Sequence, residues 1–196
     1  MTGDARDLIG HLLPSLGDIV SPDLAEKVAS VWKRLWREGG FARIEDVPWW
    51  SVVRKGDAGK SVSLIAHVNL VADCAKGLAA VAARSGAAID LDVLLAGAFL
   101  QDVDKLVLLD PQTFEPTEIA LNSQHTFYGA HVALEEGVPW PVVHLILSHS
   151  KNTGVRPRTL EAVILHYADY AVVDIRNVIE GRDELFAEHK PKWARR

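Results

Sequence analysis

The sequence predicts an all-α protein folded as a single-domain helical bundle. Apolar residues recur at helical intervals along nearly the whole chain, and no segment shows the clear alternation of a strand. The 196 residues, of which 48% are hydrophobic and 24% charged, can bury a full core as one domain. Cys74 is the single cysteine, so neither a disulfide framework nor a thiolate zinc site is expected.

The N-terminal part predicts one well-marked helix followed by an irregular segment. The helix covers about residues 23–36, because Ser21 and Pro22 form a typical start and Gly39 and Gly40 a stop. Residues 41–60 contain too many Pro, Trp and Gly residues for a long element. We expect them to form a loop that folds over another part of the molecule.

The next segment predicts a long core helix that carries a histidine. Ser61 or Ser63 is expected to cap a helix that runs to about Arg84. His67, Val71, Cys74, Ala75 and Leu78 recur at i, i+4, i+7, i+8 and i+11. This spacing places them on one face of the helix, so His67 is expected to point at the core.

A strongly apolar helix follows and ends in polar residues. Asp90 is expected to cap this helix, which runs to about Lys105. Its Ala, Gly and Leu content suits close packing against neighbouring helices. Its tail places Gln101 and Asp102 at the inner end, and a Pro-containing loop over residues 110–116 comes next.

Three further helices are expected in the C-terminal half. One covers about residues 118–136, and a break near Ser123 is left open. The second covers residues 141–150 and places His149 on the same face as the apolar residues one and two turns before it. The last covers residues 158–179 and carries His166 and Asp169 as neighbours at i and i+3.

The domain organisation is expected to be simple. Residues 1–60 are predicted to form N-terminal helices and a loop that pack on the core, residues 61–180 the helical core, and residues 181–196 a charged tail, all in one domain. Trp32 and Trp36 on the N-terminal helix could cover the core or form the face of a homodimer. The oligomeric state stays open.

Charge and hydropathy argue against several classes of partner. The net charge of −5 argues against a broad nucleic-acid-binding surface. The first residues lack a basic stretch before an apolar one, so no signal peptide is expected. No apolar run approaches the roughly 18 residues of a membrane span. We therefore expect a cytoplasmic protein that acts on a small molecule and binds neither nucleic acid nor membrane.

Polar residues on apolar helix faces indicate a site. Burying a charged aspartate without a partner costs on the order of several kcal/mol, so Asp102 and Asp169 are expected to be paired or metal-bound. A single histidine on an apolar face is more often a hydrogen-bonded core residue than a ligand. Together, three histidines and two aspartates from five predicted helices form the set that an all-α bundle needs to hold metal ions: His67, Asp102, His125, His149 and Asp169.

The order of these residues resembles the HD-domain superfamily of metal-dependent phosphohydrolases. SLIAHVNLVADCA resembles the first helix of that family, LLAGAFLQDVDK its signature, and the five residues from His125 to Gly129 its HxxxG segment. His149 in ILSHS and Asp169 in ILHYADY resemble the last two ligand positions. The resemblance covers about residues 61–174. It departs from the family at Gln101, which replaces the histidine of the His-Asp dyad.

The resemblance implies two metal positions that share Asp102. The first position would be completed by His67 and Asp169, and in the family also by the dyad histidine. The second would be completed by His125 and His149. The implied cofactor is a divalent transition metal, with Mn or Fe expected and one or two ions per chain.

Gln101 is expected to weaken the first metal position. The amide oxygen of glutamine is a weaker and harder donor to transition metals than imidazole, although it can coordinate a metal or hold a water beside it. Three outcomes stay open: two metals with one bound loosely, one metal on the intact half, or a metal-free pocket.

Four residues are candidates for catalysis: Asp102, Gln101, Lys105 and His166. Lys105 matches the lysine of the family's HDxxK pattern, which is thought to contact substrate phosphate. His166 lies one turn before Asp169 and could orient it or act on substrate, although a core histidine is the simpler interpretation. Asp104 stands where the family commonly has glycine and is expected to add negative charge near the site.

This pattern is most consistent with a hydrolase that acts on a small phosphate ester or nucleotide. A metal held by carboxylate and imidazole lowers the pKa of a bound water, which can attack a phosphoester while Lys105 neutralises charge. Two alternatives stay open. One is an HD-type di-iron oxygenase that cleaves a C–C or C–P bond, and the other is an HD-fold ligand-binding module that has lost catalysis.

Overall fold

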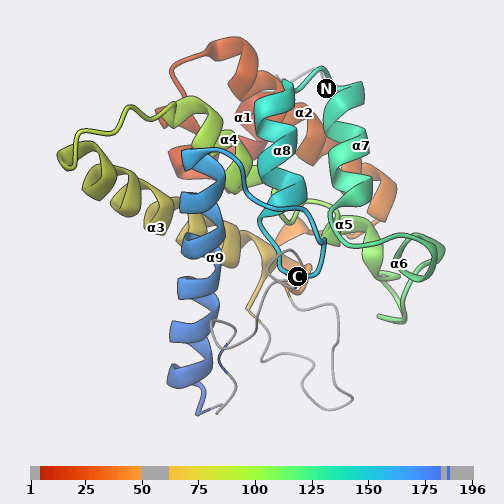
Figure 1. Ribbon diagram of the computed structural model, residues 1–196. Helices are drawn as coiled ribbons and strands as arrows, with labels where there is room; N and C mark the ends of the chain where they lie inside the picture. Colours follow the sequence, from red (N-terminus) through yellow and green to blue (C-terminus); the bar gives the residue numbers. More distant parts are fainter. Residues whose placement is uncertain (1–4, 50–61, 182–184, 186–196) are drawn as a thin grey trace.

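The computed structural model describes residues 5–49, 62–181 and 185, and these residues form helices joined by turns and loops (Figure 1). Within this part of the chain the strand-like pairings are two isolated bridges, so the predicted all-α fold class is confirmed. The helices are α1 (Ala5–Gly10), η1 (Pro14–Asp18), α2 (Pro22–Gly39), η2 (Ile44–Asp46), α3 (Leu64–Arg84), α4 (Leu91–Leu100), α5 (Lys105–Leu108), α6 (Glu118–Asn122), α7 (Phe127–Glu135), α8 (Trp140–Ser148) and α9 (Leu160–Ile179).

Side-chain caps determine where the predicted helices begin. The side chains of Ser21, Ser63 and Asp90 each accept a hydrogen bond from a backbone N–H in the first turn of α2, α3 and α4. Each cap satisfies a donor that the helix itself leaves unpaired. Ser63 is therefore the cap of α3, while the alternative, Ser61, lies outside the described residues.

α4 lies at the centre of the bundle because it is apolar on every face beyond its first turn, which carries Asp92. All its residues from Leu94 to Leu100 are buried, and it contacts α2, α3, α8 and α9. A helix without a polar face is stable only when it is surrounded. Trp32 on α2 is fully buried and donates its indole N–H to the carbonyl oxygen of Phe99 at 2.9 Å. Trp32 therefore covers the core, one of the two roles expected for it.

The helix predicted over residues 90–105 is shorter in the structure. α4 ends at Leu100, and residues 101–104 form a turn before α5 begins. In this turn the backbone N–H of Val103 donates a hydrogen bond to the carbonyl oxygen of Leu100. The acceptor lies three residues earlier in the chain, whereas in an α-helix it lies four residues earlier. Asp102 therefore lies in a tight turn, not in a helix as predicted.

The helix predicted over residues 118–136 is interrupted at the place left open near Ser123. α6 and α7 are separate helices, and Thr126 between them has a φ of 80°. That left-handed conformation ends any continuous helix at this point. His125 therefore also lies in a turn, and His149 is the residue that directly follows α8. The expectation that each ligand candidate lies within its own helix was wrong for Asp102, His125 and His149.

α3 crosses α9 and also packs on α4 (Figure 1). By length and composition, α3 is the one helix in the described part of the chain that could cross a membrane, which corrects the expectation that no apolar run approaches such a span. The apolar window is 44% buried inside the protein, and His67 is among its buried residues. Core helices commonly pass the same test, so it is weak evidence for a membrane span.

The segment before α3 is anchored back onto the start of that helix. Trp49 N–H donates to Val62 O at 2.9 Å, and Leu64 N–H donates to Val47 O at 2.8 Å. The part of the predicted loop that ends at Trp49 therefore folds over α3, as expected. Trp50 and the rest of that loop lie outside the described residues, as do most of residues 181–196. The proposed division at residues 60–61 and 180–181 stays a prediction.

Replacement of Gly39 by alanine is expected to destabilise the protein by more than about 2 kcal/mol, because overpacking against backbone cannot be relieved by a rotamer change. A Cβ at Gly39 would lie 1.8 Å from the carbonyl oxygen of Leu106 on α5. The measurement is the free energy of unfolding in urea. Gly77→Ala on α3 is the matched control. A Cβ there meets nothing within 4 Å, so this change should stabilise by about 0.5–1 kcal/mol. Equal effects would contradict the prediction.

Candidate metal centre

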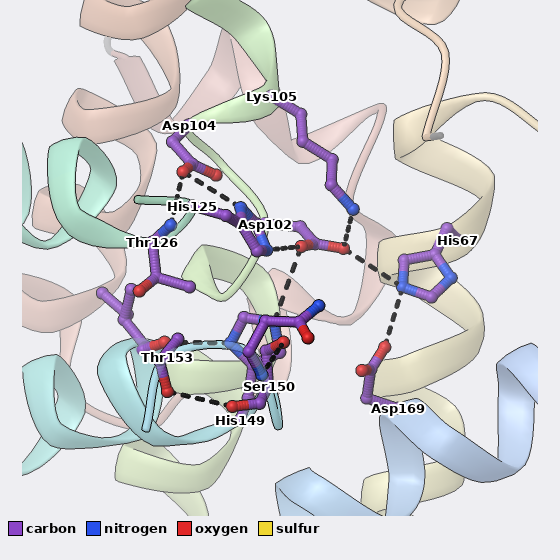
Figure 2. Close-up of polar contacts among 12 residues, drawn as sticks. His67, Asp102, Asp104, Lys105, His125, Thr126, His149, Ser150, Thr153 and Asp169 are labelled. Atoms are coloured by element: carbon purple, nitrogen blue, oxygen red, sulfur yellow. Dashed lines mark hydrogen bonds and ion pairs between the residues drawn. The ribbon is translucent and has the colours of Figure 1, made fainter. Parts of the chain in front are cut away.

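The five predicted metal ligands converge in the protein core around Asp102. Figure 2 shows Asp102 in the middle, with His125 and His149 on one side of its carboxylate and His67 on the other. His67 comes from α3 and Asp169 from α9, whereas the other three lie in turns at helix ends. His67, Asp102 and His149 are each only 2% exposed, so water cannot screen their interactions.

The five side chains form two groups that share Asp102. Ligand atoms of Asp102, His125 and His149 all lie within 4.8 Å of one another, and so do those of His67, Asp102 and Asp169. In the first group, Asp102 Oδ1 lies 3.0 Å from His125 Nε2 and 3.6 Å from His149 Nε2. The two groups correspond to the two metal positions that the family resemblance implies.

His125 and His149 are oriented by hydrogen bonds at their other ring nitrogens. His125 Nδ1 lies 3.1 Å from Asp104 Oδ2, and His149 Nδ1 lies 2.9 Å from the carbonyl oxygen of Ile146. The carboxylate and the carbonyl can only accept, so both Nδ1 atoms carry the proton. For a neutral imidazole, Nε2 then has a free lone pair. In that neutral form both lone pairs face the carboxylate of Asp102.

Asp104 is a functional candidate whose role the sequence did not suggest. Its Oδ2 accepts from His125 and also from the backbone N–H of Thr126 at 2.6 Å. Thr126 directs this N–H toward Asp104 from its left-handed conformation, which is unusual for a β-branched residue. Asp104 therefore holds the turn that presents His125, besides adding the negative charge expected of it.

The two oxygens of Asp102 have different surroundings. Oδ2 accepts hydrogen bonds from Trp49 Nε1 at 2.8 Å and from Lys105 Nζ at 2.9 Å. Oδ1 is buried and accepts no hydrogen bond from the described residues, although His125 Nε2 and His149 Nε2 lie 3.0 and 3.6 Å from it. A buried carboxylate oxygen without a hydrogen bond is costly unless a cation binds it.

His67 lies between the two aspartates of the second group. Its Nε2 is 3.1 Å from Asp169 Oδ1 and 3.3 Å from Asp102 Oδ2. The indole of Trp49 stacks on the imidazole, with ring centroids 4.2 Å apart. Trp49, which the sequence places in the irregular segment over residues 41–60, is thus part of the site itself. Its position in an irregular segment far from the other residues gave no signal of this contact.

The buried charges shift the pKa values of the central groups. Burial lowers the pKa of His125, but the carboxylates of Asp104 and Asp102 outweigh this effect and raise it to about 9. For His67, burial again lowers the pKa and the two aspartates raise it above its ordinary value. Burial raises the pKa of Asp102, whereas Lys105 and the histidines hold it well below its usual range. Asp102 is therefore ionised.

Gln101 is completely buried, and neither atom of its amide has a hydrogen-bond partner among the described residues. A buried amide normally makes several hydrogen bonds, so this side chain is a candidate for contact with a bound ion, water or substrate.

His166, the other catalytic candidate that is not a predicted ligand, donates its Nδ1–H to the carbonyl oxygen of His149 at 2.7 Å. This bond fixes the end of α8, and a catalytic role for His166 stays a prediction.

Together, the fold and the site define a class of protein: an all-α bundle with a buried cluster of histidines and aspartates suited to divalent metals. The chain belongs to the HD-domain family, whose sequence model matches residues 64–173. That match covers more than half of the chain and includes all five ligand candidates. The predicted family resemblance is thereby confirmed.

One curated relative is similar over part of the chain. This protein, a dihydroneopterin 2',3'-cyclic phosphate phosphodiesterase from Methanocaldococcus jannaschii, is 29% identical over 97 residues. The aligned region covers 47% of the chain and 39% of the length of the relative. No solved structure matches the chain significantly.

Proposed function

We propose that the protein is a metal-dependent phosphohydrolase that acts on a phosphate ester of a small molecule or on a nucleotide. Membership of the HD-domain family and the phosphodiesterase name of the relative support the reaction class. The observation that carries the proposal is the buried Asp102 Oδ1, which has no hydrogen-bond partner in the described part of the chain and faces the Nε2 atoms of His125 and His149.

The donor set suits a divalent transition metal such as Mn or Fe. His125 and His149 each donate their Nδ1–H elsewhere. As neutral imidazoles, they would therefore direct the lone pair of Nε2 at the lone pairs of Asp102 Oδ1. This arrangement is repulsive unless a cation lies between the three atoms: a proton on His125, which its raised pKa provides in the metal-free protein, or a metal ion that replaces it. Imidazole and carboxylate ligands are those that Mn and Fe commonly take. We therefore propose His125, His149 and Asp102 as metal ligands. His67 and Asp169, which form the second candidate group with Asp102, are the donors available to a second ion.

The proposed chemistry divides between the metal and the side chains. When bound, the metal supplies Lewis-acid activation of water and of a phosphate oxygen. The Lys105 ammonium, held beside Asp102 and only 11% exposed, adds positive charge that stabilises the charge on a phosphate group. Asp104 keeps the imidazole of His125 in the tautomer that presents Nε2.

The function can be tested by assaying phosphate chemistry and metal content together. Protein purified without chelator is expected to contain bound transition metal and, with Mn or Fe, to hydrolyse some members of a panel of phosphomonoesters, cyclic phosphodiesters and nucleotides. Consumption of O₂ by iron-loaded protein, without phosphoester hydrolysis, would instead support the di-iron oxygenase, for which the two ligand groups sharing Asp102 provide a specific argument. Absence of metal after incubation with Mn or Fe would favour the ligand-binding module.

Metal binding is expected to release protons and to strengthen as the pH rises. Below its pKa of about 9, the metal-free His125 carries a proton that must leave before Nε2 can ligate. The affinity for Mn should therefore rise about tenfold per unit between pH 7 and pH 9 from this group alone. Titration calorimetry at pH 7.5 in two buffers with different ionisation enthalpies measures the release. Identical heats in both buffers would contradict the prediction.

A further inference from the structure

The two oxygens of the Asp102 carboxylate are not equally available to a metal. Oδ2 already accepts hydrogen bonds from Trp49 Nε1 and Lys105 Nζ, at 2.8 and 2.9 Å. A carboxylate oxygen has two lone-pair sites, so these two donors occupy it. Oδ1 has no hydrogen-bond partner among residues 5–49 and 62–181, and it lies on the side of His125 and His149. One metal position thus has a free carboxylate oxygen, and the other does not.

The donors to Oδ2 are held firmly in place. The ammonium of Lys105 lies 4.7 Å from the ring centroid of Trp49, within range of a cation–π interaction. The indole in turn stacks on His67, and the backbone of Trp49 is bonded to Val62. Because the lysine side chain is nearly buried, its charge is poorly screened. A divalent ion ligated at Oδ2 would lie against this ammonium group and be repelled by it.

The charge of the cluster also suits a single divalent ion. The carboxylates of Asp102, Asp104 and Asp169 carry three negative charges, and the Lys105 ammonium carries one positive charge. Neutral imidazoles, the form in which histidine ligates, add no charge. The net charge of −2 is balanced by one divalent metal, whereas two would leave a buried excess of positive charge.

We propose that the chain binds one divalent metal, on Asp102 Oδ1, His125 Nε2 and His149 Nε2, and that the Lys105 ammonium takes the place of a second metal at Asp102 Oδ2. This inference rests on the metal site of the proposed function and deepens it. Gln101 is consistent with this proposal. The family has a ligating imidazole near His67 and Asp169, whereas this chain has a neutral amide there. That half of the site already contains the positive charge of Lys105.

The first experiment counts metals in the full chain and in a matched pair of variants. After saturation with Mn and removal of unbound ions, plasma mass spectrometry should find one metal per wild-type chain. His149→Gln should weaken Mn binding by at least about 100-fold, because it removes a ligand. His67→Gln, the same change in the other half, should leave the affinity within about threefold of wild type. Circular dichroism verifies that each variant is folded.

The second experiment tests the place of Lys105. Lys105→Met keeps an unbranched side chain of similar size to the lysine stem and removes the ammonium, so it should allow a second Mn to bind to Asp102 Oδ2, His67 and Asp169. Lys76→Met is the matched control, since the Lys76 ammonium also pairs with a carboxylate but does so on the surface, with Asp18. The control should still bind one metal. A Lys105→Met variant that also binds only one would overturn the role of Lys105.

The outcomes separate this inference from the proposed function. Two metals in the wild-type chain, or equal losses in His67→Gln and His149→Gln, would overturn the single-metal site while leaving a metal-dependent phosphohydrolase intact. A chain that binds no Mn and no Fe would overturn both. Hydrolysis of a phosphoester with one metal per chain, lost in His149→Gln, would support both.

Discussion

Replacement of Asp102 by alanine is expected to abolish metal binding and to lower phosphoester hydrolysis by at least about a thousandfold. Asp102 is the one residue common to both ligand groups, so its loss removes a ligand whichever group holds metal. A metal acting as a Lewis acid contributes several kcal/mol to transition-state stabilisation, and about 1.4 kcal/mol corresponds to a factor of ten in rate. The measurements are the metal content and the rate of phosphate release.

Two further variants control for effects on folding. Asp102→Ala leaves the Lys105 ammonium nearly buried and without its carboxylate, which is itself destabilising. Asp102→Asn keeps the shape and the acceptor for Trp49 and Lys105, yet removes the charge, so it should remain folded and still lose the metal. Asp46→Ala, at an exposed aspartate in η2, should change neither property. Metal retention in folded Asp102→Asn would contradict the assigned role.

The fold is largely predictable from the sequence because its signals are local. A helix start depends on a side chain reaching a backbone N–H three residues away, as Ser21, Ser63 and Asp90 do. The apolar composition of α4 likewise indicates a buried central helix. The turn at residues 101–104 cannot be predicted from such local signals. It depends on which backbone carbonyl accepts a hydrogen bond from each N–H after the neighbouring helices have packed.

The convergence of the five ligand candidates is also predictable, since each is a polar residue on or beside an apolar helix face. The contacts around them are harder to anticipate. Trp49 reaches Asp102 across 53 positions in sequence, from a segment without regular periodicity. Asp104 reaches His125 across 21 positions, and that pairing depends on the left-handed backbone of Thr126. Such contacts follow from tertiary packing, which local patterns do not encode.

Asp104→Ala is expected to weaken metal binding by about 10- to 100-fold, although Asp104 is not proposed to touch the metal. Partners of the non-ligating nitrogen of a histidine ligand fix its tautomer and ring orientation, and their loss commonly costs this much affinity. In this protein, Asp104 supplies that partner for His125 and also binds the N–H of Thr126. The dissociation constant for Mn, measured by calorimetry, is the relevant quantity.

A purely structural role for Asp104 can be distinguished through the pH dependence of metal binding. Its charge is the main factor that raises the pKa of His125 above its ordinary value. Without that charge the pKa of His125 falls, so the affinity of the Asp104→Ala variant for Mn should stop rising at a lower pH than in the wild type. Asp104→Asn retains an acceptor for His125 but no charge, so it should recover part of the affinity while keeping the altered pH dependence. A folded alanine variant with weaker binding but an unchanged pH profile would show that Asp104 only holds the turn.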